Sequence, residues 1–135
     1  MVRILVVEDF TPYRQFICST LAANPDLQVI GEISDGQKAV QEAEKLQPDL
    51  ILLDIGLETL NGIETARRIR KLAPNSRIIF LTQESDAEVV QEAFNTGAYG
   101  YVLKARVKTD LEAAIEAALN GRRYISEGLV GPMRP

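Results

Sequence analysis

Five short apolar runs, separated by segments with helical periodicity, constrain the fold of this chain more than any other feature. The runs are aliphatic and often β-branched; they are Ile4–Val7, Val29–Ile30 with its flanks, Leu50–Leu53, Ile78–Leu81 and Tyr101–Leu103. Near-continuous apolar runs of this length are typical of strands buried on both faces of a parallel sheet. The polar residues that follow the runs recur about every 22–28 residues, the spacing of strand–helix units with right-handed crossovers.

The segments between the runs repeat their apolar residues with a period near 3.6 and carry residues that begin or end helices. Ser85–Glu88 and Thr109–Glu112 have the pattern of capping boxes, and Gly97 and Gly121 stand where helices would stop. We therefore expect one α/β domain over residues 1–124. Residues 125–135 are expected to be a flexible tail or the start of a linker.

The composition excludes several kinds of site. The chain contains no His, and Cys18 is its single cysteine. Catalytic triads that use His, His-based zinc sites and internal disulfides are therefore ruled out.

The charge and hydropathy pattern bear on the partners. The net charge is −4, with 15 basic and 19 acidic residues, which argues against direct nucleic-acid binding by this chain alone. The basic run at 67–71 is interpreted as a solvated helix face. Neither a signal-peptide core nor about 18 consecutive apolar residues occurs, so we expect no contact with a membrane and a cytoplasmic location.

Polar residues of complementary chemistry follow four of the apolar runs. They are Glu8, Asp9, Asp54, Thr82 and Lys104. The carboxyl ends of parallel strands open on one edge of the sheet, so we expect these side chains to meet there. Three carboxylates repel one another and need a cation, and all-oxygen ligands select a hard ion such as Mg²⁺. With an ammonium and a hydroxyl nearby, the pattern indicates a phosphoryl site in which a carboxylate can be the nucleophile.

Four motifs, in order along the chain, resemble the receiver domain of bacterial two-component response regulators. They are Ile4–Asp9, Leu52–Ile55, Leu81-Thr82 and Tyr101–Lys104. The stretch Gly97–Lys104 looks most like the subfamily that carries a C-terminal helix-turn-helix output domain. The resemblance spans about residues 2–125 and implies a flavodoxin-like (βα)5 doubly wound sheet with strand order 2-1-3-4-5.

The resemblance also implies the roles of the acidic residues. Asp54 would be the phosphoacceptor, taking a phosphoryl group from a sensor histidine kinase. Glu8, Asp9 and Asp54, together with the backbone carbonyl of Gly56, would hold Mg²⁺.

The remaining site residues would respond to phosphorylation. Thr82 would hydrogen-bond the phosphoryl group, Lys104 would pair with one of its oxygens, and the rotamer of Tyr101 would follow Thr82. In the family the peptide bond after this lysine is often cis, so we expect a cis bond between Lys104 and Ala105. The alternative is a trans bond, with Lys104 reaching the site through its long, flexible stem.

The function implied is a phosphorylation-controlled switch rather than an enzyme. The surface formed by the fourth helix, fifth strand and fifth helix would bind or release a partner. The partners implied are a sensor histidine kinase, a second copy of the chain after phosphorylation, and an output domain or downstream protein. Regulation of transcription is expected if a helix-turn-helix domain belongs to the same protein. With 11 residues after Tyr124, a stand-alone receiver and a piece of a longer regulator both remain open.

Three alternatives to a phosphorylation-controlled receiver have less support in the sequence. A flavin carrier of the same fold would need a phosphate loop without Glu8 and Asp9, and an aspartyl-phosphate hydrolase would need a second Asp where Gly56 stands. A degenerate receiver that binds proteins without phosphorylation stays open. It is suggested by Glu58, where the family usually has Pro, and by the long Gln83 after Thr82.

Overall fold

Strands and helices alternate along the chain in the order that the apolar runs predict. The computed structural model describes residues 1–127 and 129. The strands are β1 (Val2–Val7), β2 (Leu27–Ile33), β3 (Leu50–Asp54), β4 (Arg77–Thr82), β5 (Gly100–Leu103) and β6 (Tyr124–Ile125). The helices are α1 (Thr11–Ala22), α2 (Gly36–Leu46), α3 (Gly62–Leu72), α4 (Ala87–Asn95), the 3₁₀ turn η1 (Lys104–Arg106) and α5 (Val107–Leu119).

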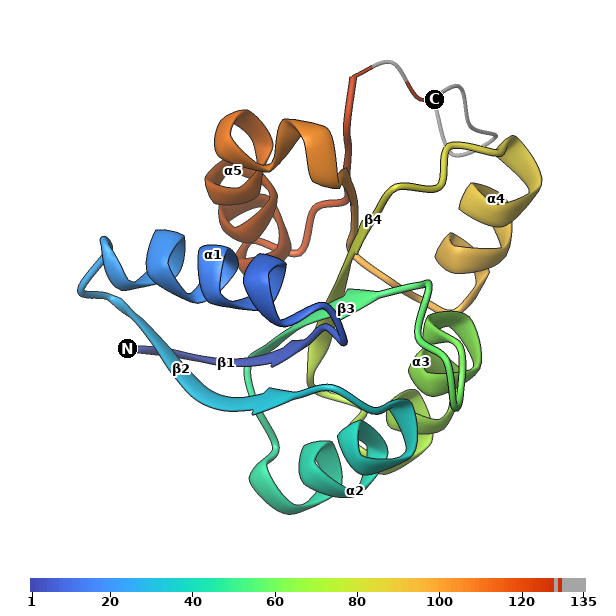
Figure 1. Cartoon of the computed structure of the whole chain (residues 1–135), viewed down its shortest axis with the longest axis horizontal. Coiled ribbons are helices and arrows are strands. Elements are labelled where there is room, and N and C mark those ends of the chain that lie inside the picture. The colour runs from blue at the N-terminus through green and yellow to red at the C-terminus, as the bar shows by residue number, and fades with distance from the viewer. Residues whose placement is uncertain (128, 130–135) are drawn as a thin grey trace.

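All the strands form one parallel sheet with the order β2-β1-β3-β4-β5-β6. The predicted flavodoxin-like fold and the order 2-1-3-4-5 are confirmed. Figure 1 shows α1 and α5 on one face of the sheet and α2, α3 and α4 on the other. Right-handed crossovers produce this arrangement because β2 lies on one side of β1 and β3 to β5 follow on the other side, so the chain changes direction across the sheet after β2.

Each face of the sheet has its own core, because side chains alternate along a strand. Ile4 and Val6 of β1 face the core that α1 and α5 cover. Leu5 and Val7 face the core under α2, α3 and α4. β3 is buried along its whole length, so the strand that ends in Asp54 is held rigidly between the two layers.

The sixth strand differs from the sequence-based expectation. The sequence predicts a flexible tail or the start of a linker from residue 125, yet Ile125 pairs with Tyr101 of β5 and Ser126 is buried. The edge of β5 offers unpaired backbone groups, and the Ser126 N–H donates to the carbonyl of Tyr101 at 2.9 Å. The rest of the predicted tail, 128 and 130–135, lies outside the described residues.

Two helix starts also differ from the capping-box pattern. Asp86 rather than Ser85 caps α4, since its carboxylate accepts from the N–H of Glu88 at 2.8 Å. α5 begins at Val107, directly after η1, instead of at the predicted box that starts at Thr109. Asp110 therefore lies inside the first turn of α5, where it is buried.

Among the described residues, no helix combines the length and the apolar character that crossing a lipid bilayer requires.

Candidate functional site

Parallel pairing of adjacent strands brings the predicted site residues to one edge of the sheet. β1 pairs with β3, β3 with β4 and β4 with β5, so their carboxyl ends lie side by side. Glu8 follows β1, Asp54 ends β3, Thr82 ends β4 and Lys104 follows β5. Four segments that are far apart in the sequence thus supply neighbouring side chains.

These side chains open into a cavity of about 370 Å³ at the edge of the sheet. It is lined by Glu8, Asp9, Phe10, Asp54, Ile55, Gly56, Thr82, Gln83, Glu84 and Lys104. The acidic residues, the hydroxyl and the ammonium predicted to meet therefore do so. Gln83 also borders the cavity, whereas Glu58 is exposed and is not part of its lining.

The ammonium of Lys104 lies between two buried carboxylates. Its Nζ is 2.6 Å from Oε1 of Glu8 and 3.5 Å from Oδ2 of Asp54, and the lysine side chain is 14 % exposed. The expected cis bond between Lys104 and Ala105 is wrong, because the described chain contains no cis peptide bond. The long, flexible lysine stem reaches the carboxylates from a trans backbone, so the energetic cost of a cis bond is avoided.

The three carboxylates form a compact group that could hold a cation. One oxygen from each of Glu8, Asp9 and Asp54 lies within 4.8 Å of the others. An Mg²⁺ octahedron is roughly 4 Å across its opposite oxygens, so small side-chain adjustments would fit this set to the ion. Burial raises the pKa of Glu8 and the Asp54 carboxylate acts in the same direction, although the Lys104 ammonium opposes both. A divalent cation would relieve this excess of negative charge.

Asp54 is fixed by contacts to both carboxylate oxygens. Oδ1 accepts a hydrogen bond from the backbone N–H of Gly56 at 3.1 Å, and Oδ2 faces Lys104. The side chain is 8 % exposed and lines the cavity. Gly56 thus lies beside Asp54. A residue whose carbonyl binds the same metal ion as Asp54 would need to be at this position.

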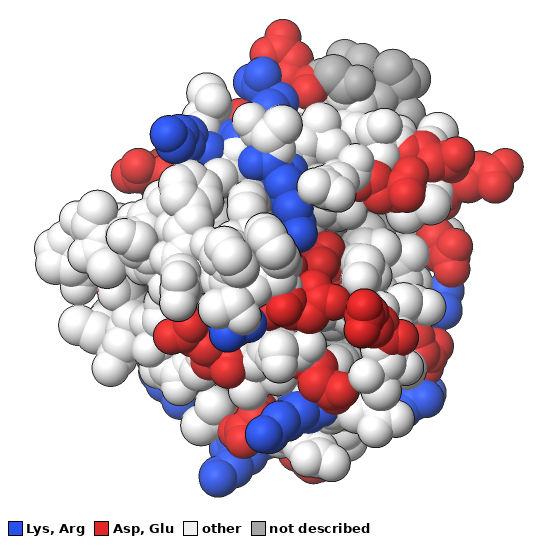
Figure 2. All heavy atoms as spheres, in the orientation of Figure 1, with Lys and Arg blue, Asp and Glu red and all other residues white. Residues whose placement is uncertain are grey.

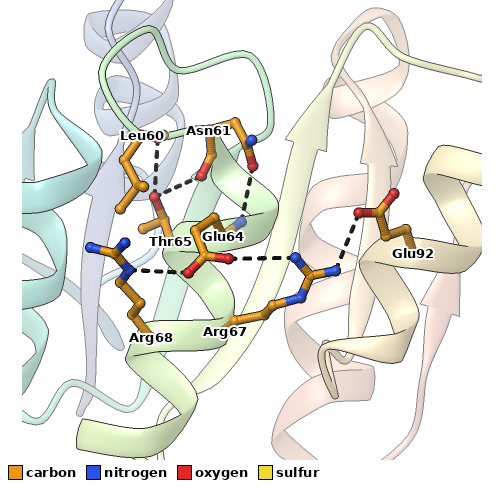
Figure 3. Close-up of polar contacts among 7 residues, drawn as sticks. All are labelled: Leu60, Asn61, Glu64, Thr65, Arg67, Arg68 and Glu92. Atoms are coloured by element: carbon orange, nitrogen blue, oxygen red, sulfur yellow. Dashed lines mark hydrogen bonds and ion pairs between the residues drawn. The ribbon is translucent and has the colours of Figure 1, made fainter.

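The loop after Asp54 is anchored where α3 begins, and Figure 3 shows the contacts. Asn61 caps the helix by accepting from the N–H of Glu64 at 2.9 Å. The hydroxyl of Thr65 donates to the carbonyls of Asn61 and Leu60 at 2.8 and 3.2 Å. These bonds satisfy polar groups at the helix end and fix the far end of the loop that borders the cavity.

Two basic residues of α3, Arg67 and Arg68, pair with acids of the same protein (Figure 3). Glu64 lies between Arg67 and Arg68, at 3.5 and 3.1 Å, and Arg67 also reaches Glu92 of α4 at 3.2 Å. All four side chains are at least one-third exposed, so each pair contributes little to stability. This agrees with the interpretation of the basic run as a solvated helix face.

Thr82 and Tyr101 meet at one residue of the β4–α4 loop. Oγ1 of Thr82 accepts from the N–H of Glu84 at 3.0 Å, and the hydroxyl of Tyr101 donates to the Glu84 carbonyl at 2.8 Å. The Tyr101 ring is fully buried between Phe80 and Phe94, with ring centroids 6.3 and 6.2 Å away. Tyr101 therefore packs in the core and also holds the loop beside the cavity.

Sequence reasoning missed two residues at this edge. The N–H of Phe10 donates to Oε2 of Glu8 at 3.0 Å, and the Tyr13 ring lies against the Lys104 ammonium. Both follow the Glu8-Asp9 pair closely, which is the signal that could have found them. Helical periodicity assigns Tyr13 to a helix but does not say which strand end it faces.

Comparison with known proteins agrees with the geometry. The model of the response regulator receiver domain matches residues 4–116. The transcriptional regulatory protein LiaR of Bacillus subtilis is 35 % identical over 131 residues, which are 97 % of this chain and 62 % of LiaR. The nitrate/nitrite response regulator NarL of Escherichia coli K12 is 36 % identical over 126 residues, covering 93 % of this chain and 58 % of NarL. The chain thus spans about three-fifths of the length of these relatives.

A solved structure of a LuxR-family two-component response regulator from Aurantimonas sp. SI85-9A1 has the same fold. The TM-score is 0.89 at 32 % identity, and the match covers 94 % of this chain and 91 % of that one. The receiver domain of Thermotoga maritima CheB superposes with a TM-score of 0.82 at 32 % identity, over 89 % of this chain and 97 % of that chain. This chain belongs to the family of response regulator receiver domains, a family of two-component signalling proteins.

Proposed function

We propose that this chain is a phosphorylation-controlled receiver in which Asp54 accepts a phosphoryl group from a sensor histidine kinase. The observation that carries the proposal is the cavity in which Asp54, Lys104, Thr82 and the Glu8-Asp9 pair converge. A nucleophilic carboxylate, an ammonium, a hydroxyl and an oxygen-only cation site are what phosphoryl transfer to an aspartate requires.

Each side chain has a task in the proposed transfer. An oxygen of Asp54 forms the new P–O bond while the P–N bond of the kinase phosphohistidine breaks, and the departing imidazole keeps the electron pair and takes up a proton. Lys104 and Thr82 bind oxygens of the transferred group. The Gly56 N–H keeps Asp54 oriented during the attack. Glu8, Asp9, Asp54 and the Gly56 carbonyl would hold Mg²⁺, which neutralises charge on the phosphoryl oxygens when bound.

The switch would begin at Glu84, the residue that both Thr82 and Tyr101 contact. The Thr82 oxygen accepts from the Glu84 N–H, and its O–H would donate to a phosphoryl oxygen, so a shift of Thr82 toward that oxygen would pull on Glu84. Tyr101, which donates to the Glu84 carbonyl, would transmit this change in the loop to the core. The surface of α4, β5 and α5 would change with it and bind or release a second copy of the chain, an output domain or a downstream protein. Since LiaR is a transcriptional regulatory protein, we propose a transcriptional output in the cytoplasm, with DNA contacts made outside this chain.

Phosphorylation by a small-molecule donor tests the proposal directly. Acetyl phosphate with Mg²⁺ should add one phosphoryl group to the wild-type protein, detected by intact-protein mass spectrometry. Asp54→Asn should abolish the addition. Asp49→Asn should leave it unchanged, because exposed Asp49 precedes the same strand at its opposite end.

Equal phosphorylation of Asp54→Asn and wild type would show that the phosphoacceptor is another residue. No phosphorylation of the wild type, with the fold intact, would favour the alternative in which the receiver binds its partners without being phosphorylated.

A further inference from the structure

In the proposed function Lys104 binds an oxygen of the phosphoryl group, which depends on the position of its flexible side chain. Four carbon atoms separate the ammonium from the backbone, so the strand end alone does not fix it. η1 begins at Lys104, and the backbone turns away from the sheet at this residue. Contacts from outside β5 must therefore hold the lysine if its ammonium is to meet Asp54 reproducibly. The Glu8 carboxylate, 2.6 Å from Nζ, is one of them.

Tyr13, in the first turn of α1, contacts both ends of this lysine. Its hydroxyl donates a hydrogen bond to the Lys104 carbonyl at 3.1 Å. The face of its ring lies 4.7 Å from the Lys104 Nζ, measured to the ring centroid, which is within cation–π range. One side chain thus holds the backbone and the charged tip of Lys104.

The surroundings of Tyr13 keep this arrangement in place. Phe16, one turn further along α1, packs against the Tyr13 ring with centroids 5.8 Å apart. Burial, followed by the Glu8 and Asp54 carboxylates, raises the pKa of Tyr13 to about 12. The hydroxyl is therefore protonated and able to donate at neutral pH.

The contact between Tyr13 and Lys104 is compatible with phosphoryl transfer to Asp54. Tyr13 lies beside Lys104 without lining the cavity that contains Asp54, so it leaves the approach to Asp54 open. An aromatic face attracts the cation without neutralising it, unlike a carboxylate. Tyr13 therefore holds the ammonium without adding a third negative charge to the Glu8 and Asp54 carboxylates that already pair with it.

We propose that Tyr13 is a positioning residue for phosphoryl transfer to Asp54, acting by holding the backbone and the ammonium of Lys104. This inference rests on the proposed function. Tyr13 does not line the cavity that contains Asp54, so its effect on the transfer would pass through Lys104.

Rates of phosphorylation by acetyl phosphate at saturating Mg²⁺ measure the effect. Tyr13→Leu removes the ring and the hydroxyl and should slow phosphorylation about three- to tenfold. Tyr13→Phe keeps the ring and should lose at most about threefold. The matched control is Tyr99→Leu, because Tyr99 is a half-buried tyrosine under a different cation, Arg77, with 5.2 Å between the guanidinium carbon and the ring centroid. It should leave the rate unchanged.

A double-mutant cycle tests whether the effect passes through Lys104. In a Lys104→Met background, Tyr13→Leu should cause no further slowing. An equal slowing in both backgrounds would overturn the inference, since Tyr13 would then act by another route.

Proton NMR provides a readout that does not depend on phosphorylation. The Tyr13 ring should shift the Lys104 Hε protons upfield of those of exposed Lys45 in wild type, in Tyr13→Phe and in the Tyr99→Leu control. Tyr13→Leu should remove the shift. Identical Lys104 Hε shifts in wild type and Tyr13→Leu would overturn the inference.

The two proposals fail in different ways. Phosphorylated wild type with an undiminished rate in Tyr13→Leu overturns the role of Tyr13 and leaves the proposed function standing. Wild type that takes up no phosphoryl group overturns the proposed function and the positioning role with it.

Discussion

Asp110 is a buried carboxylate outside the cavity, and it joins segments that follow the site lysine. Its Oδ2 accepts from the Ser126 hydroxyl at 2.7 Å and from Nε of Arg106 at 3.1 Å. The Ser126 oxygen in turn accepts from the N–H of Leu103 at 3.0 Å. A single carboxylate therefore links η1, α5 and the segment after β6 to the end of β5.

The pKa of Asp110 predicts how its contribution to stability depends on pH. Burial acts to raise this pKa, but hydrogen bonds from Ser126, Arg106 and Tyr124 outweigh it and hold the pKa below the ordinary 3.8. A carboxyl group with a lowered pKa in the folded state stabilises that state above its ordinary pKa. The stabilisation is lost as the pH falls through the lowered value.

Asp110→Asn should therefore lower the free energy of unfolding at pH 7 by about 1–3 kcal/mol. The difference from wild type should shrink below about pH 4, where the wild-type carboxylate is protonated in the unfolded chain and then in the folded one. Urea unfolding of wild type and Asp110→Asn, at pH 7 and below about pH 4, measures this difference in the free energy of unfolding. Exposed Asp26→Asn is the control. A difference that stays constant with pH would mean that the charge of Asp110 does not contribute.

At the scale of elements, the close contact between the end of β3 and the start of α3 determines the position of Asp54. A Cβ built at Gly62, the first residue of α3, would overlap the carbonyl oxygen of Asp54 and lie 2.6 Å from Cα of Ile55. The Gly62 N–H also donates to the carbonyl of Ile55 at 2.9 Å. The helix can approach the strand end this closely because this position lacks a side chain.

Gly62→Ala should push α3 away from the end of β3. We expect the free energy of unfolding to fall by about 1–3 kcal/mol and phosphorylation of Asp54 to slow, because both result from the same displacement. For the free energy of unfolding, the control is Gly56→Ala in the same loop, where the new Cβ would be 3.7 Å from Oδ1 of Asp54, an ordinary contact. It is not a control for phosphorylation, because the Gly56 N–H contacts Asp54. Chemical denaturation measures the free energy of unfolding. A Gly62→Ala protein as stable as Gly56→Ala would contradict the close approach.

At the scale of the whole molecule, the charge bears on what the chain binds. Figure 2 shows acidic side chains gathered over α4 and across the middle of the face in view. The net charge of the chain is −4, and Arg67 and Arg68 are engaged by Glu64 and Glu92. Such a surface repels the phosphates of nucleic acids.

We therefore expect this chain alone not to retard duplex DNA in a gel shift at physiological salt, with or without acetyl phosphate. Lowering the salt should not produce binding, because the excess of acidic residues, 19 against 15 basic ones, repels the DNA phosphates more strongly at low salt. Sequence-specific retardation by residues 1–135 would contradict this.

The sequence by itself determined the fold class and most of the site. The apolar runs indicate the strands because they are short, rich in β-branched residues and bounded by polar or turn residues, and the helical period indicates the crossovers. Parallel strands end at one edge, so Glu8, Asp54, Thr82 and Lys104 had to meet once the topology was known. This part of the prediction needed only local patterns and one topological rule, whereas the strand order and the roles of Gly56 and Tyr101 came from the resemblance to receiver domains.

The tertiary structure alone decided the contacts between elements. Ser126 is buried because β5 has a free edge and Asp110 accepts its hydroxyl, and neither fact is visible in a segment rich in Gly and Pro. The trans bond after Lys104 and the position of Tyr13 depend on how α1 and η1 pack against each other across the end of the sheet. Such contacts join residues 91 positions apart in the sequence, so local periodicity carries no information about them.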